Sequence, residues 1–198
     1  MDQLIRCFGD GDPLYEAYHD DEWGLPVHGD RELFERMSLE AFQSGLSWIT
    51  ILRKRPAFRT AFVDFDPRRV AEFGPDDVAQ LLANAGIVRN RAKIEATVAN
   101  ARALVVLWEE GRTLDELFWS FAAGVQGDAE VAPRPRPTVW SDVPAQTDES
   151  RALARALKSA GFRFVGPTTA YASMQACGMV DDHLADCSAV VIRNGAGT

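Results

Sequence analysis

Long apolar runs are absent from this 198-residue chain. No stretch of about 18 consecutive apolar residues occurs, so we expect no helix that crosses a membrane. The opening residues, MDQLIRCFGDGD, carry acidic side chains and lack the apolar region of a secretion signal. From these two absences we expect a cytoplasmic protein.

Cysteine is scarce as well, with three residues at positions 7, 177 and 187. An odd number in a chain without a secretion signal argues against a disulfide framework. Three are also too few for an iron–sulfur cluster held by four cysteines. The roles left open are metal ligand and buried thiol.

Positive charge is in short supply, because 21 Lys and Arg face 29 Asp and Glu and the formal net charge is -8. Non-specific affinity for nucleic acids comes from basic surface, so this balance argues against a general nucleic-acid binder. Basic residues nevertheless cluster at 53–55, 68–69 and 89–93. A small basic face on an acidic protein is compatible with DNA binding that is modest in affinity and sensitive to salt.

Strand patterns are rare, whereas helical spacing of apolar residues recurs along the chain. We expect Asp30 to cap a helix that stops at Gly45, and Ser47 to cap a second one that Pro56 ends. Pro67 and Pro75 suit the first position of short helices. The helix after Pro75 is expected over 76–86, and further helices are expected over 90–111, 113–124, 148–161 and 168–178.

One segment, 124–147, is rich in Pro and Gly without a period, and we expect a surface excursion there, with a flexible tail over 188–198. With 46% hydrophobic residues the chain is able to bury a sizeable core. The expected architecture is all-α, a compact orthogonal helical bundle forming one domain over 1–198.

His183 and Cys187 stand four residues apart, which on a helix places both side chains on one face. Imidazole and thiolate are zinc ligands, and a structural zinc needs four of them. Cys177 has small and apolar neighbours typical of a buried thiol, and His28 lies in a loop expected at the surface. Cys7 and His19 are the remaining partners. Spacing alone leaves open that His183 and Cys187 are ordinary helix residues.

Glu40 falls on the apolar stripe of its expected helix, together with Leu33 and Met37. A carboxylate there is costly unless it has a partner or a function. With Tyr18, Trp23 and Trp48 it would form an aromatic box containing one acid, which suits a flat, cationic ring. The alternative is that the aromatics are core and that Glu40 pairs with Arg36 or Arg53.

Five stretches, in order, resemble the DNA-3-methyladenine glycosylase I family of the helix-hairpin-helix glycosylase superfamily. They are DPLYEAYHDDEWG, LEAFQSGLSWITILRKR, NAGIVRNRAKIEATVANARA, GFRFVGPTTAYASMQACGMVDDH and a terminal His-x3-Cys. The resemblance covers residues 6–187. It implies an all-α glycosylase fold with a structural zinc, one per chain, that joins the N- and C-terminal segments.

The resemblance also implies functional residues. Zinc ligands would be Cys7, His19, His183 and Cys187; the base pocket would use Glu40, as the catalytic residue, with Tyr18 and a stacking Trp48. Trp23 and Phe8 would complete the pocket. The region matching NAGIVRNRAKI would meet the DNA backbone through Arg89, Arg91 and Lys93.

The chain departs from its relatives beside the first cysteine, where many of them carry Cys-x-Trp. Here the stretch is RCFGDGDP and Phe8 is the nearest aromatic, so the outer wall of the pocket is not defined by the sequence. The segment QGDAEVAPRPRPTVW is also longer and richer in proline than in relatives.

The implied activity is base-excision repair: hydrolysis of the N-glycosidic bond of 3-methyladenine in alkylated double-stranded DNA, by a monomer that flips the nucleotide out and has no lyase step. Two other classes stay open. One is a zinc-stapled helical module that binds a cation or a lesion without chemistry; the other is a zinc hydrolase in which water replaces one ligand.

Overall fold

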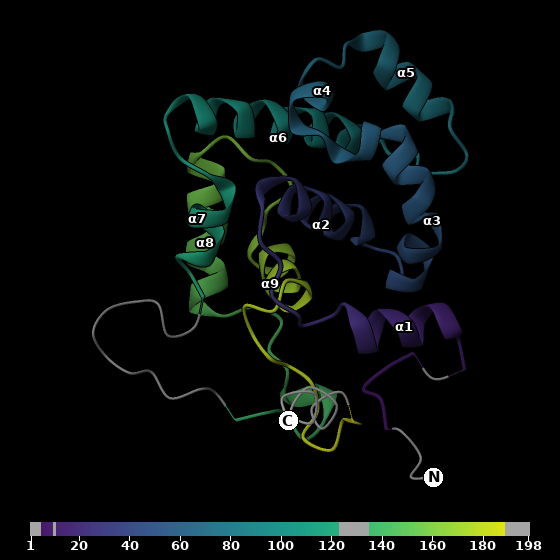
Figure 1. Cartoon of the computed structure of the whole chain (residues 1–198), viewed down its shortest axis with the longest axis vertical. Coiled ribbons are helices and arrows are strands. Elements are labelled where there is room, and N and C mark those ends of the chain that lie inside the picture. The colour runs from purple at the N-terminus through teal and green to yellow at the C-terminus, as the bar shows by residue number, and fades with distance from the viewer. Residues whose placement is uncertain (1–4, 10, 123–134, 189–198) are drawn as a thin grey trace.

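The computed structural model describes residues 5–9, 11–122 and 135–188, and the described chain is all-helical (Figure 1). This confirms the expected fold class. Its α-helices are α1 (Pro13–Asp21), α2 (Asp30–Gln43), α3 (Trp48–Ala61), α4 (Pro67–Ala71), α5 (Pro75–Ala83), α6 (Arg91–Glu109), α7 (Leu114–Trp119), α8 (Asp148–Ser159) and α9 (Pro167–Ala176). Two short 3₁₀ turns, η1 (Val63–Phe65) and η2 (Trp140–Asp142), lie between them.

The central helix is α2, which lies between α3, α6, α7 and α9 (Figure 1). Every residue from Met37 to Phe42 is buried, so this helix meets packed neighbours on all sides. Around it, α4 packs on α6 and α8 packs on α9. A functional side chain on α2 is therefore held by a rigid core rather than by a surface loop.

Several helix boundaries follow the local sequence. Pro67 and Pro75 occupy first turns, where their missing N–H is not needed. Asn90 accepts a hydrogen bond from the backbone of Lys93 at the start of α6. Thr113 forms a capping box with Glu116 on α7.

Two boundary predictions were wrong. Gly29 stands at the N-cap of α2, and the Asp30 carboxylate instead accepts hydrogen bonds from the Trp108 indole and the Asp115 backbone. Helix α3 continues through Pro56 to Ala61. Ile51 and Phe58, on either side of the proline, are both fully buried, so core packing outweighs the one backbone hydrogen bond that the proline removes.

The two ends of the described chain lie side by side. The Ile5 N–H donates to the Ser188 hydroxyl at 2.7 Å, and the Ser188 N–H donates to the Ile5 carbonyl at 2.7 Å. The tail predicted over 188–198 otherwise lies outside the described residues, as does 124–134 of the predicted excursion. None of the described helices is long and apolar enough to cross a membrane.

Candidate functional site

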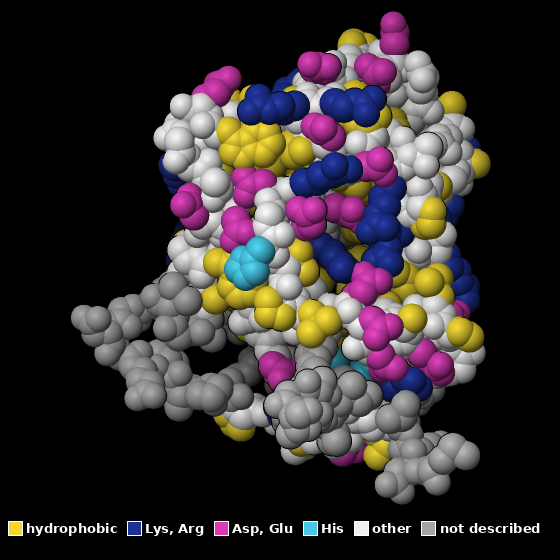
Figure 2. Space-filling model, viewed as in Figure 1, with side chains coloured by type: hydrophobic (Ala, Val, Ile, Leu, Met, Phe, Trp, Pro, Cys, Tyr) yellow, Lys and Arg dark blue, Asp and Glu magenta, His cyan; other side chains and the backbone are white. Residues whose placement is uncertain are grey.

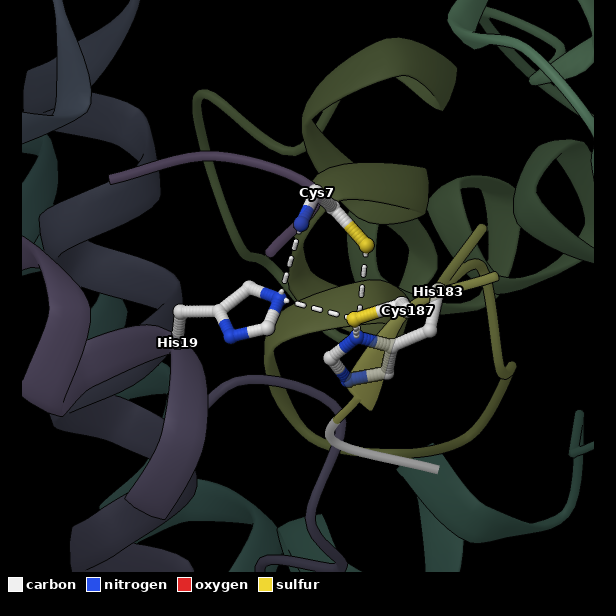
Figure 3. A group of neighbouring side chains, drawn as sticks. All are labelled: Cys7, His19, His183 and Cys187. Carbon is white, nitrogen blue, oxygen red and sulfur yellow. Dashed lines mark hydrogen bonds between the residues drawn. The ribbon is translucent and has the colours of Figure 1, made fainter. Parts of the chain in front are cut away.

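Four side chains from opposite ends of the chain converge in one cluster, which comprises Cys7, His19, His183 and Cys187 (Figure 3). Their donor atoms all lie within 4.8 Å of one another. The Cys187 sulfur is 3.3 Å from His19 Nε2 and 3.5 Å from His183 Nδ1. The Cys7 sulfur lies 3.5 Å from the same His183 nitrogen.

The second nitrogen of each imidazole is already engaged outside the cluster. His19 Nδ1 lies 2.8 Å from the carboxylate of Asp20, which Arg6 holds in turn. His183 Nε2 lies 3.3 Å from the backbone carbonyl of Trp23. These contacts turn His19 Nε2 and His183 Nδ1 toward the two sulfurs, the arrangement that outer partners give to metal-binding histidines.

The chemistry of the donor set fits a metal ion. Burial and the neighbouring Cys187 raise the pKa of the Cys7 thiol to about 12, so two thiolates this close need a cation between them. Two sulfurs and two imidazoles are a typical tetrahedral donor set. The four residues can therefore hold a metal.

The helix expected beneath His183 and Cys187 is wrong, because residues 181–187 form an irregular loop with a turn at 185–186. The two side chains meet because that loop bends, with the Cys187 N–H donating to the Leu184 carbonyl. The Leu184 N–H donates to the Cys7 sulfur at 3.2 Å, which brings the N-terminal segment to the loop. Cys177 is fully buried and His28 is exposed, and neither belongs to the cluster.

A cavity of about 370 Å³ lies beside this cluster. It is lined by Phe8, Tyr15, Tyr18, Trp23, Glu40, Gln43, Trp48, Trp140, Ala172 and Gln175. A larger groove of about 830 Å³ along α6 and α8 is lined by small residues such as Ala103 and Ala156 and contains no aromatic ring. Of these two, the smaller cavity combines aromatic walls with a buried acid.

Glu40 is 7% exposed, and its carboxylate has no hydrogen-bond or ion-pair partner within the described residues. Burial raises the pKa of this carboxyl to about 8, although Arg36 nearby acts in the opposite direction. The expected alternative of an ion pair is not found, because Arg36 binds Glu22 and Arg53 binds Asp12. Glu40 therefore lines the cavity with its hydrogen-bonding capacity unused.

Aromatic rings surround this acid. The Tyr18 and Trp48 rings lie 5.2 Å apart, and Phe8 meets Trp23 edge-on at 5.2 Å. The Trp48 indole N–H is buried and has no hydrogen-bond partner in the described part of the chain. The structure thus brings together all five pocket residues expected from the sequence.

Sequence reasoning missed the remaining lining residues. The Tyr15 ring lies tilted against Phe8 with ring centroids 4.9 Å apart, and helical spacing from Tyr18 on α1 could have indicated it. Gln43 lies one turn after Glu40 on α2, another readable signal. Trp140 comes from a segment a hundred residues away and carries no local signal that points to the pocket.

The three basic residues expected at the DNA backbone are in different environments. Arg89 and Arg91 are exposed, with Arg91 paired to Glu95 at 3.2 Å. Lys93 is 8% exposed, and its ammonium donates to the carbonyls of Phe42 and Ser44 at the end of α2. Because this amine is engaged inside the protein, the structure does not place Lys93 where it could meet a phosphate.

Basic side chains are interspersed with acidic ones on the face shown in Figure 2, and they form no continuous basic surface there. This agrees with the acidic net charge of the sequence. Any DNA contact on such a face is local rather than spread over the molecule.

Comparison with known proteins gives consistent matches over most of the chain. A family model described as methyladenine glycosylase matches residues 8–190. DNA-3-methyladenine glycosylase 1 of Escherichia coli (strain K12) is 46% identical over 176 residues, covering 89% of this chain and 91% of that protein.

Two solved structures extend the comparison to the fold. A crystal structure of 3-methyladenine DNA glycosylase I aligns with a TM-score of 0.85 at 45% identity and covers 92% of this chain and 98% of the other. A variant of 3-methyladenine DNA glycosylase I, in complex with 3-methyladenine, aligns with a TM-score of 0.82 at 34% identity, covering 92% of this chain and 95% of that one.

Proposed function

The chain belongs to the methyladenine glycosylase family, and from this premise we propose that it removes 3-methyladenine from alkylated double-stranded DNA as a monofunctional glycosylase. Members of the family hydrolyse the N-glycosidic bond between a damaged base and its sugar. The observation that carries the proposal for this chain is Glu40, a buried acid without a partner in the described structure, in a cavity walled by Tyr18 and Trp48.

Recognition of the base rests on charge. Methylation at N3 makes adenine in DNA cationic, and an ionised Glu40 offers that ring a carboxylate in a poorly solvated cavity. Tyr18 and Trp48 add aromatic faces, which attract cations by about 1–2 kcal/mol each when water is excluded. Normal adenine is neutral and lacks both the attraction to the carboxylate and the attraction to the aromatic faces, so the pocket favours the damaged base.

Access to the cavity requires base flipping. A base stacked in a duplex cannot reach a carboxylate that is 7% exposed, so the nucleotide has to rotate out of the helix. Leu46 supports this step: it is 40% exposed on the turn between Gln43 and Trp48, which both line the cavity. An exposed apolar side chain at that place is suited to fill the gap left in the base stack.

The chemistry asks little of the protein because the substrate is already activated. As the C1′–N9 bond breaks, its electron pair neutralises the positive charge of the base, which leaves as free 3-methyladenine. Water adds to C1′ and releases one proton, so the product is an abasic site. No lysine lines the cavity, and Lys54 and Lys93 both donate to backbone carbonyls, which supports a reaction without a Schiff-base lyase step.

We infer that the metal of the Cys7 cluster is one structural zinc per chain. Four protein donors fill a tetrahedral shell and leave no position for an activated water, which argues against the zinc-hydrolase alternative. Bound there, zinc would tie the N-terminal segment and the 181–188 loop together. Arg89 and Arg91 remain the candidates for contact with the DNA backbone. We expect a monomer that works in the cytoplasm.

Release of free 3-methyladenine from methylated duplex DNA tests the proposal. We expect Glu40→Gln to lose most of the activity, since the amide keeps the size of the side chain and removes its charge. Glu109→Gln, an exposed position at the end of α6, is the matched control and should act like wild type. A wild-type chain that binds methylated DNA without releasing the base would make it a binding module instead.

A further inference from the structure

Trp140 lines the same cavity as Glu40 although it belongs to a distant segment. Its ring lies 6.3 Å from Phe8 and 6.3 Å from Trp23, measured between ring centroids. The side chain is 44% exposed, whereas Trp23 across from it is buried. Trp140 is therefore an aromatic wall at the solvent side of the cavity, the side that the sequence alone left undefined.

The position of this ring is fixed by hydrogen bonds. The Trp140 indole N–H donates to the Cys7 carbonyl at 3.0 Å, next to the metal cluster. The turn η2 that carries the ring is closed by the Asp142 carboxylate, which accepts bonds from Thr138 and Val139.

The segment leading to the turn is attached to the C-terminal loop by two further contacts. The Ala185 N–H donates to the Pro137 carbonyl at 2.9 Å. Arg136 forms an ion pair with Asp181 at 2.7 Å. A ring held from both sides in this way is preorganised, so it contributes to binding without the entropy cost of ordering a loose side chain.

We propose that Trp140 is a base-contacting residue that determines specificity in this glycosylase, covering the extruded base on the solvent side of the pocket. The inference rests on the proposed function. A partly exposed indole at the mouth gains burial when a base enters, shields the Glu40 carboxylate from water and adds an aromatic face that prefers a cationic ring. The hydrogen bond to Cys7 leaves the face of the indole available, because that bond lies in the ring plane.

The first test follows the five tryptophan indole N–H signals of ¹⁵N-labelled protein during titration with free 3-methyladenine. The Trp140 signal is identified by its loss in Trp140→Phe. We expect it to shift on titration, whereas those of Trp108 and Trp119 stay in place, because their indoles donate to Asp30 and to the Val27 carbonyl away from the cavity. A stationary Trp140 signal, while the Trp48 signal shifts, would overturn the inference and leave the proposed function intact.

The second test compares variants for binding of free 3-methyladenine and for its release from methylated DNA. Trp140→Ala should weaken binding about 5- to 150-fold, the range for loss of a base–aromatic contact. Trp140→Phe keeps a ring and loses only the bond to Cys7, so its loss should stay below about fivefold. Val139→Ala, at an exposed neighbour, is the control and should change neither quantity.

The outcomes separate the two proposals. If Trp140→Phe and Trp140→Ala weaken 3-methyladenine binding equally, the indole serves only to hold the Cys7 carbonyl, and the base-contacting role is wrong. If Trp140→Ala binds like wild type, that role is also wrong. If wild-type protein neither binds nor releases 3-methyladenine, the proposed function itself fails and takes this inference with it. Thermal unfolding of each variant shows whether a loss reflects misfolding.

Discussion

At the scale of single residues, Glu40 is a buried carboxyl whose charge is not balanced within the described structure. Its helix is fixed in the core by neighbours such as Leu39 and Phe42, so the carboxyl cannot move to water. Without a partner its ionised form is destabilised, and the pKa rises to about 8. On the proposed function, a cationic base would supply the opposite charge, so binding of that base and ionisation of Glu40 would favour each other.

The raised pKa of Glu40 predicts a pH-dependent stability. The unfolded carboxyl ionises near pH 4.5, whereas the folded one keeps its proton until about pH 8. Between these values the folded state binds the extra proton, so this group's contribution to stability is full below pH 4.5 and is lost as pH rises toward 8. The total loss is of the order of 5 kcal/mol.

Glu40→Gln cannot titrate and should escape this loss. The variant should therefore gain stability over wild type as pH rises from 5 to 8.5, measured as the difference in urea unfolding free energy at each pH. The difference between the two proteins removes the contributions of all other acids, which they share. A gap that stays constant with pH would show that Glu40 ionises normally in the folded chain.

At the scale of elements, close backbone approaches hold the pocket segments in place. Gly178, just after α9, has a φ of +72°, and a Cβ there would lie 2.5 to 2.7 Å from backbone atoms of Leu25 and Pro26. The same segments are joined by the Val27 N–H, which donates to the Cys177 carbonyl. This contact attaches the chain that follows Trp23 to the helix that carries Ala172 and Gln175.

Gly178→Ala should consequently lower the free energy of unfolding by much more than its backbone angle alone would cause. Gly111 has the same φ of +72° with no atom within 4 Å of its missing Cβ, so Gly111→Ala measures the cost of the angle, about 1–2 kcal/mol. We expect Gly178→Ala to lose at least about 2 kcal/mol more, because backbone atoms cannot move aside cheaply. If chemical unfolding shows that both variants lose the same unfolding free energy, the segments around Pro26 and Gly178 separate easily.

Local sequence was sufficient where local forces decide the structure. The first-turn prolines 67 and 75 act within a few residues, and the structure has helices where they predict them. Asn90 and Thr113 cap two helices that the apolar spacing predicts. The helix end predicted at Pro56 was wrong because burial of Phe58 and Ile51, a tertiary effect, stabilises the helix beyond the proline. The burial of Lys93 was not readable either, because its amine donates to carbonyls about fifty residues away.

In the pocket, too, the residues set by local sequence could be predicted and those set by tertiary contacts could not. Glu40 on an apolar stripe, and the aromatic residues near it in the sequence, are readable because one helix and its neighbours carry them. Trp140 was not readable, since its place depends on bonds to Cys7 and, through its turn, to the 181–185 loop. The convergence of Cys7 with Cys187 depended on resemblance, because the spacing of four suggested a helix that does not exist.

At the scale of the whole molecule, the cluster of Cys7, His19, His183 and Cys187 joins the two ends of the described chain. Residues 5–8 and 181–188 meet there, far from each other in sequence, and Figure 1 shows the described parts of these segments together below the bundle. The outer wall of the pocket is attached to this cluster. Phe8 follows Cys7 in sequence, and the Trp140 indole N–H donates to the Cys7 carbonyl. If the proposed zinc is bound there, we expect its removal to loosen the outer wall of the pocket while α2, with Glu40, stays in the core.

Cys187→Ser tests this dependence, with Cys177→Ala as its matched control. Both cysteines are buried, but only Cys187 belongs to the cluster. We expect wild type and Cys177→Ala to carry one zinc per chain by elemental analysis. Cys187→Ser should lose the metal and at least about 3 kcal/mol of unfolding free energy, because the remaining thiol and imidazoles then lie buried without their shared cation. Its Trp140 indole signal should also broaden, whereas that of Trp108, which binds Asp30 in the bundle, should not. A Cys187→Ser protein that keeps wild-type stability and a sharp Trp140 signal would show that the cluster is not what holds the wall of the pocket.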